Sequence, residues 1–116
     1  MDPRTMNEHE LGTVIARRMF DCGENNVLLE IGMPYPIDKG PDCWCPYRIS
    51  GLGSGKVKRI GGVDSMQALY LAMQMAATDL YASDAAREKI LQWLGQLNLG
   101  LPVSKVIADL VPPEDE

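Results

Sequence analysis

Hydrophobic and polar residues alternate through the first half of the chain, and this spacing predicts β-strands. Val27, Leu29 and Ile31, for example, would lie on one face of a strand. The expected strands cover residues 11–20, 27–32, about 42–50 and 56–60. The turn-forming stretches DCGENN and GLGSG join two of the pairs, and the proline-rich 33–42, MPYPIDKGPD, is expected to be an irregular connection. Strands with such links predict an antiparallel meander.

The pattern changes to helical spacing after residue 62. Asp64 is a suitable N-cap residue, and Gln67 three positions later completes a capping-box-like pair. The apolar positions then recur every three or four residues: Met66, Leu69, Tyr70, Met73, Ala77 and Leu80. Apolar residues on the other flank indicate a helix buried against more than one element, which we expect to be the sheet and later helices.

Two further helices are expected in the last third of the chain. The first starts at Ser83 or Asp84, runs to about Leu94 and ends at Gly95. Its expected inward residues are Ala86, Ile90, Trp93 and Leu94. A short helix over 103–110 would follow, with Val103, Val106, Ile107 and Leu110 inward.

These elements predict an α+β fold with two layers, in which a four-stranded antiparallel meander is followed by two or three helices packed on one face. Residues 11–110 would form a single domain, between a flexible N-terminus (1–10) and an acidic, disordered tail (111–116).

The chain of 116 residues has 11 basic and 16 acidic side chains and a net charge of −5. This balance argues against nucleic acid as a partner and against anionic membrane surfaces. The first residues have no apolar signal core, and the apolar stretch 66–80 is interrupted too often to span a membrane. Three cysteines are too few for a disulfide scaffold, so we expect a reducing, cytoplasmic location.

The stretch DCWCPYRI carries the most conspicuous side chains. If it is a strand, Cys43 and Cys45 share a face with Tyr47, while Trp44 and Arg48 point the other way. Zinc would need two more ligands, and only Cys22 and His9 remain. We therefore interpret both cysteines as structural, and we expect no metal and no cofactor.

Catalytic signals are weak. The single histidine lies near the N-terminus, the aspartates are scattered through loops and caps, and GLGSGK lacks the spacing of a phosphate-binding loop. The sequence therefore predicts no catalytic residues and a non-enzymatic protein.

Basic residues gather in the expected strands and in the turn before the last strand, namely Arg17, Arg18, Arg48, Lys56, Lys58 and Arg59. One interpretation is a solvated face whose charges guard the sheet edges. The sharper hypothesis is a protein-binding surface on the exposed face of the sheet, because arginine and aromatic residues are common interface anchors. Its contact residues would be Trp44, Arg48, Arg18 and Lys58, with an acidic protein as partner.

A second hypothesis places a small-molecule or enzymatic cleft between the sheet and the proline-rich loop. Tyr35, Asp38, Asp42 and Cys45 would line it. A homodimer through an edge strand or through the Met-rich helix is a further possibility that the sequence leaves open.

The motifs EIGMPYP, WCPYRISGLG, GGVDSMQALYLAM and LGLP resemble a family of small bacterial proteins known as a domain of unknown function, over about residues 12–104. The positions that fit the family pattern are Trp44, Cys45, Pro46, Tyr47, Gly62, Val63, Asp64, Gln67, Ala68 and Leu69, and Cys43 is outside it. The resemblance implies a bacterial, cytosolic single-domain protein and brings no activity. By analogy of size and fold, an immunity, inhibitor-like or accessory role fits.

Overall fold

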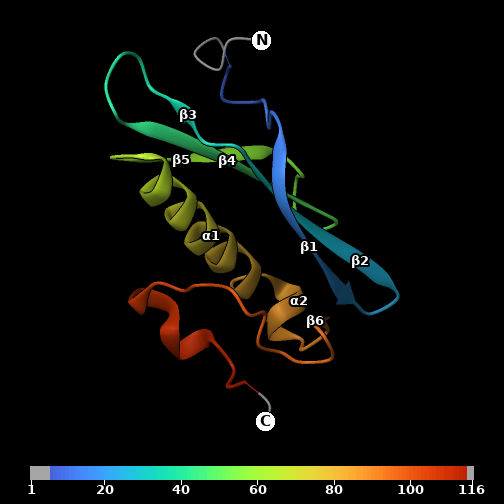
Figure 1. The fold of residues 1–116 in the computed structure, drawn as a ribbon. Helices are drawn as coiled ribbons and strands as arrows, with labels where there is room; N and C mark the ends of the chain where they lie inside the picture. Colours follow the sequence, from blue (N-terminus) through green and yellow to red (C-terminus); the bar gives the residue numbers. More distant parts are fainter. Residues whose placement is uncertain (1–5, 115–116) are drawn as a thin grey trace.

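A computed structural model describes residues 6–114 of the chain. The elements in order are β1 (Val14–Cys22), β2 (Asn25–Gly32), β3 (Tyr35–Pro36), β4 (Cys43–Ser50), β5 (Val57–Gly62), α1 (Ser65–Tyr81), α2 (Asp84–Arg87), β6 (Leu91–Gln92) and the 3-10 helix η2 (Lys105–Leu110). Figure 1 shows one twisted sheet with α1 lying across one of its faces. The α+β class is confirmed.

All strand pairs of the sheet are antiparallel. The order β1-β2-β4-β5 is that of the expected meander, with β5 at one edge. Within residues 6–114 the sheet has six strands rather than four, because β3 pairs with β4 beyond the end of β2, and β6 pairs with β1 at the other edge. The short β3 lies within the stretch expected to be irregular.

The register of β4 is the one that alternation predicts. Cys45 and Tyr47 are buried on the face that α1 covers, while Trp44 and Arg48 are only half-buried. Tyr47 also donates a hydrogen bond to Asp79 of α1, which fixes the direction of its side chain. We call the face covered by α1 the inner face, and the opposite one the outer face.

The contact stripe of α1 consists mainly of small side chains. Ala68, Ala72, Ala76, Ala77 and Leu80 are fully buried. Two of the six expected positions, Met66 and Tyr70, are instead 79% and 48% exposed. Helical spacing was correct, but alanine allows the closest approach to the sheet, so the large side chains are displaced to the flanks.

The close approach begins at the junction between β5 and α1. The Asp64 side chain accepts a hydrogen bond from Gln67 N, and Gln67 Oε1 accepts one from Val63 N, so the capping pair is confirmed. A Cβ atom on Gly62 would lie 2.8 Å from Ala68 Cα. A side chain at position 62 would therefore push the helix away from the strand.

The second expected helix is wrong beyond its first turn. Helix α2 ends at Arg87, β6 then pairs with the end of β1, and Trp93 and Gln96 exchange two backbone hydrogen bonds of 2.9 Å. Leu94 and Gly95 have φ of 51° and 77°, as a tight hairpin turn requires. The open edge of β1 competes successfully with local helix propensity here.

The third expected helix is the 3-10 helix η2, and it is only partly inward. Val103 and Ile107 pack against the core, but Val106 is 92% exposed and Leu110 58% exposed. Successive residues of a 3-10 helix lie a third of a turn apart, so the neighbouring Val106 and Ile107 cannot both face the core.

The ends of the described chain both contact the fold. Leu11 is buried, and its carbonyl lies next to Gly32. At the other end, Val111 packs against the core and the Pro112 carbonyl accepts a hydrogen bond from Asn98. Half of the expected flexible N-terminus, residues 1–5, and the last two residues of the expected tail lie outside the described residues.

Candidate functional site

A row of three charged side chains crosses the outer face of the sheet. In the strand register Arg17 of β1 pairs with Glu30 of β2, and Glu30 pairs with Arg48 of β4. Arg48 Nη2 and Nε both donate to Glu30 Oε1, at 2.8 and 3.3 Å. Arg17 is exposed and has no charged partner among residues 6–114. The row therefore presents one net positive charge on an acidic protein.

A second cluster lies at the β5 side of the outer face. The Arg59 guanidinium stacks on the Trp44 ring, 4.0 Å from its centroid, and its Nη1 donates to the Tyr35 hydroxyl at 2.9 Å. Tyr35 is 3% exposed, whereas Trp44 remains half-buried. Arg59 thus has an aromatic ring and a hydroxyl as partners, and no carboxylate partner within residues 6–114.

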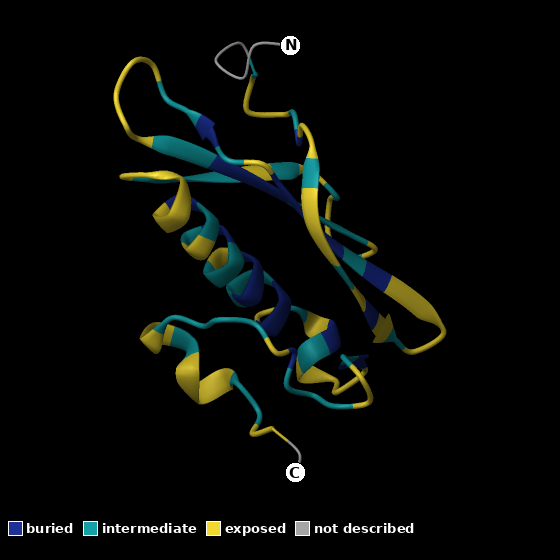
Figure 2. Ribbon diagram, viewed as in Figure 1, coloured by how far each residue is buried: buried dark blue, intermediate teal, exposed yellow. Residues whose placement is uncertain are grey.

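Exposed apolar side chains complete this face along β1. Met19 is 53% exposed, and Ile15, next to the irregularity in the β1–β2 register, is 43% exposed. Figure 2 shows much of β1 as exposed. Neither residue was among those expected at the surface from the sequence. The sequence signal for Met19 was its place next to Phe20, because neighbouring residues of a strand point to opposite faces and Phe20 is a core residue.

Arg18 lies on the inner face, so the expectation that it shares a surface with Trp44 is wrong. Its register partner is Leu29, a core residue. Its guanidinium lies over the Trp93 ring and donates to the carbonyls of Leu99 and Gly100, each at 3.1 Å. Arg18 therefore holds the C-terminal segment on the sheet.

Lys58 also lies on the inner side of the sheet, so the expectation that it shares a surface with Trp44 is wrong. It pairs with Tyr47 in the register, and its ammonium lies 3.1 Å from Asp79 Oδ2 on α1. The same oxygen accepts the Tyr47 hydroxyl hydrogen bond at 2.8 Å. Alternation places Lys58 opposite Arg59, because neighbouring residues of a strand point to opposite faces.

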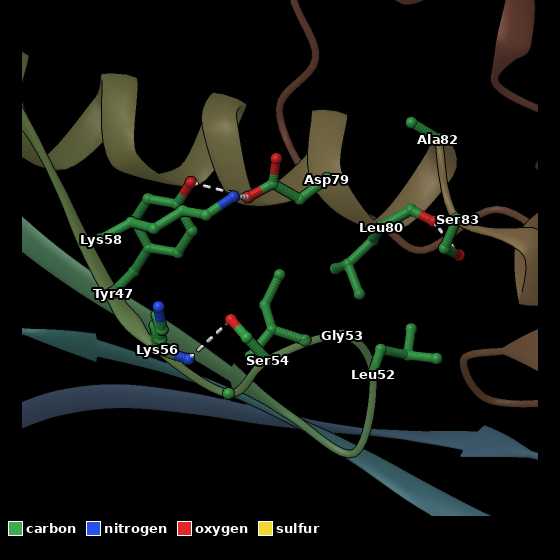
Figure 3. Close-up of a pocket in the computed structure, with 12 residues that line it drawn as sticks. Tyr47, Leu52, Gly53, Ser54, Lys56, Lys58, Asp79, Leu80, Ala82 and Ser83 are labelled. Carbon is green, nitrogen blue, oxygen red and sulfur yellow. Dashed lines mark hydrogen bonds and ion pairs between the residues drawn. The ribbon is translucent and has the colours of Figure 1, made fainter.

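The side chains of Tyr47, Lys58 and Asp79 border a hollow of about 280 Å³ between the glycine-rich β4–β5 loop and the end of α1 (Figure 3). Ile49, Leu52 and Leu80 contribute its apolar wall. Burial, together with the hydrogen bond to Asp79 and the carboxylate charge, raises the pKa of Tyr47 above its ordinary value. The hydroxyl therefore stays protonated at neutral pH and cannot serve as a base.

The residues of the alternative cleft are not brought together. Tyr35 pairs with Trp44 and points to the outer face, whereas Cys45 is fully buried on the inner face. Asp38 and Asp42 are exposed in the connecting loop. The two-residue spacing from Cys43 to Cys45 correctly predicted that both side chains point to the same face of the sheet. The face to which Tyr35 points depends on its pairing with β4, which the sequence does not show.

Cys45 has the surroundings of a core residue. Its Sγ is 3.5 Å from the Gly32 carbonyl, and burial raises the pKa of the thiol to about 12. The reactive form of cysteine is the thiolate, which is negligible here at neutral pH. Within residues 6–114, no three His, Cys, Asp or Glu side chains are grouped to hold a metal ion.

A scan of family models matches residues 16–103 to the Domain of unknown function (DUF6968). The chain belongs to the DUF6968 family. The resemblance to an uncharacterised domain family is thereby confirmed, and the matched range includes most of β1 and the whole of β2 to β6 and α1. Neither the curated proteins nor the solved structures contain a match.

In the described part of the chain, no helix has the length and apolar character needed to cross a bilayer.

Proposed function

We propose that this protein is a non-catalytic interaction module, inhibitor-like or accessory, that presents the outer face of its sheet to an acidic protein partner. The observation that carries the proposal is the composition of that face: Arg17, Arg48 and Arg59 lie with Trp44 and the exposed Met19 on a surface that α1 leaves open. Arginine, tryptophan and methionine are enriched at protein interfaces.

The distribution of charge favours an acidic protein as the partner. The chain as a whole carries −5, but the outer face has three arginines against two carboxylates, the partly shielded Glu30 and the exposed Asp21 near the β1–β2 turn. Such a separation steers an acidic protein to this face and repels it from the rest of the surface. Trp44 and Arg48 of the original hypothesis remain proposed contact residues, and Arg17 and Met19 take the places of Arg18 and Lys58.

The test is a quantitative capture experiment from a lysate of the cells that express the protein, with wild type compared to two matched double variants. Arg17→Glu with Met19→Asp changes the outer face, where both side chains are exposed. Lys105→Glu with Val106→Asp makes the same chemical changes on η2, also at exposed positions.

A partner recovered by wild type and by the η2 variant, but reduced at least about tenfold with the outer-face variant, supports the proposal. Thermal unfolding of all three proteins must be similar, because surface changes of this kind shift stability by only about 0.5 kcal/mol. Equal recovery with both variants would refute a role for the outer face.

A further inference from the structure

Strand β5 is an edge strand with an open side. It pairs only with β4, and none of residues 6–114 forms a strand or backbone hydrogen bond on its other side. Helix α1 covers the inner face of the sheet and does not extend around this edge (Figure 1). A row of unpaired N–H and C=O groups is a template for another strand.

The register identifies which groups are open. Ile37 N donates to the Asp42 carbonyl at 2.8 Å, so the backbone of Asp42 points toward the β3 side of β4. Because backbone directions alternate along a strand, Pro46 also points to that side, and Cys45 and Tyr47 point to β5. Pro46 lies between the part of β4 that pairs with β2 and the part that pairs with β3. Its missing N–H therefore removes no hydrogen bond from either strand pair.

The same alternation applies on β5 itself. Ile60 and Lys58 are the register partners of Cys45 and Tyr47, so their backbone groups bond to β4. The N–H and C=O groups of Val57, Arg59 and Gly61 therefore point to the open edge. An added strand could form three pairs of hydrogen bonds along it.

The surroundings of this edge suit a side chain of a bound strand. A hollow of about 510 Å³ runs along β5, with Trp44 and Arg59 on the outer side and Met75 of α1, 39% exposed, on the inner side. Glu8 and His9 of the segment before β1 also line it. Alternate side chains of an extended peptide would reach these two sides in turn.

Charge decides between possible occupants. Lys56, Lys58 and Arg59 lie within four residues, and only Lys58 has an acidic partner, Asp79, among the described residues. A second copy paired through β5 would place these bases against one another, which is unfavourable for cross-strand neighbours. An acidic strand would place carboxylates against them.

We propose that an extended acidic segment of the partner protein adds to β5 as an antiparallel strand. Main-chain hydrogen bonds to Val57, Arg59 and Gly61 would hold it, and its carboxylates would pair with Arg59 on the outer side of the edge or with Lys56 on the inner side. This inference rests on the proposed function, since it describes how the same class of partner docks, and it uses the edge rather than the outer face.

The direct probe is a fluorescein-labelled peptide, EVEVEVE, measured by fluorescence anisotropy against the full chain, with KVKVKVK as the charge control. Gly61→Pro removes one open N–H without touching the β4 ladder, and Gly61→Ala retains that N–H. An added Cβ at this position would lie 3.4 Å from the Trp44 ring and 3.8 Å from the Cys43 carbonyl oxygen, both ordinary contacts, so the alanine variant should fold normally.

We expect saturable binding of the acidic peptide only, weakened at least about tenfold by Gly61→Pro and less than about twofold by Gly61→Ala. In amide NMR spectra, exchange protection should rise at Val57, Arg59 and Gly61. Absence of saturable binding, equal binding to the proline variant, or a dimer of the free protein that the proline variant dissociates would each overturn the inference.

The Arg17→Glu, Met19→Asp variant separates this inference from the proposed function. It should bind the peptide like wild type, because neither residue lies at the β5 edge. If lysate capture depends on the outer face but the peptide never binds, the edge inference fails alone. If the peptide binds while capture is insensitive to the outer face, the outer-face proposal fails alone.

Discussion

The guanidinium carbon of Arg18 lies 3.7 Å from the centroid of the Trp93 ring, and this contact joins the first strand to the hairpin that follows β6. The same guanidinium donates to the Leu99 and Gly100 carbonyls. Nearby, Leu99 N donates to the Tyr81 hydroxyl at 2.7 Å. The C-terminal segment is thus held to both the sheet and α1 by polar contacts as well as by apolar packing.

Arg18→Ala should lower the free energy of unfolding by about 2 kcal/mol, because it removes a stacked cation and two charge-assisted hydrogen bonds from a partly buried site. Arg17→Ala is the matched control, since Arg17 is the exposed neighbour on the outer face and should change stability by less than about 0.5 kcal/mol. Urea unfolding monitored by circular dichroism measures both. Equal effects would contradict the inner placement of Arg18.

Tyr47→Phe should destabilise the fold by about 1 kcal/mol, because the hydroxyl bond to Asp79 is lost at a buried position. Tyr70→Phe is the control on the same helix-sheet layer, at a residue that is 48% exposed. Chemical denaturation at neutral pH compares the two variants.

The same hydroxyl makes stability depend on alkaline pH. Since the folded pKa of Tyr47 lies above the ordinary value near 10, the unfolded chain ionises first, and the stability present below about pH 10 declines above it. The wild type should therefore lose more stability than Tyr47→Phe when the pH is raised from neutral into this range. If the stability of the two proteins falls equally with rising pH, the pKa of Tyr47 is not raised in the folded state.

Gly62→Ala should cost about 2 kcal/mol or more, because a Cβ there would lie 2.8 Å from Ala68 Cα and the helix would have to shift. Gly40→Ala is the control, since a Cβ at position 40 has no heavy atom within 4 Å. Differential scanning calorimetry should show a clear fall in the melting temperature for the first variant only. A tolerant Gly62→Ala would mean that α1 is not seated closely on β5.

Cys45 should resist thiol reagents in the folded protein, because its side chain is fully buried and burial raises its pKa to about 12. A protein with Cys22→Ser and Cys43→Ser isolates this thiol. Its modification at mildly alkaline pH should follow the rate of global unfolding and become fast in denaturant. Rapid reaction under native conditions would indicate an accessible, reactive site.

The raised pKa of Cys45 also makes the stability of the fold depend on pH. The raised folded value means that its contribution is complete below about pH 9 and is lost as the pH rises toward 12. In the same serine background, Cys45→Ala should lower stability at neutral pH and reduce its decline above pH 9. Measurement of unfolding at several alkaline pH values tests this.

The sequence by itself determined the local patterns. Alternation placed Cys45 and Tyr47 inside and Trp44 outside, and Asp64 with Gln67 marked the start of α1, because strand period and helix capping depend on neighbouring residues only. The order β1-β2-β4-β5 followed from short turns. Membership of a family of unknown function could be recognised from ordered motifs.

Only the tertiary structure decided the features that depend on contacts between distant segments. Residues 91–92 are a strand rather than helix because β1 offers an unpaired edge, and Arg18 and Lys58 are inner residues because Trp93 and Asp79 meet them from elsewhere in the chain. Likewise, the open edge of β5 is defined by what does not pair with it within residues 6–114. Local propensity is worth tenths of a kcal/mol per residue, and long-range pairing and packing outweigh it where they conflict.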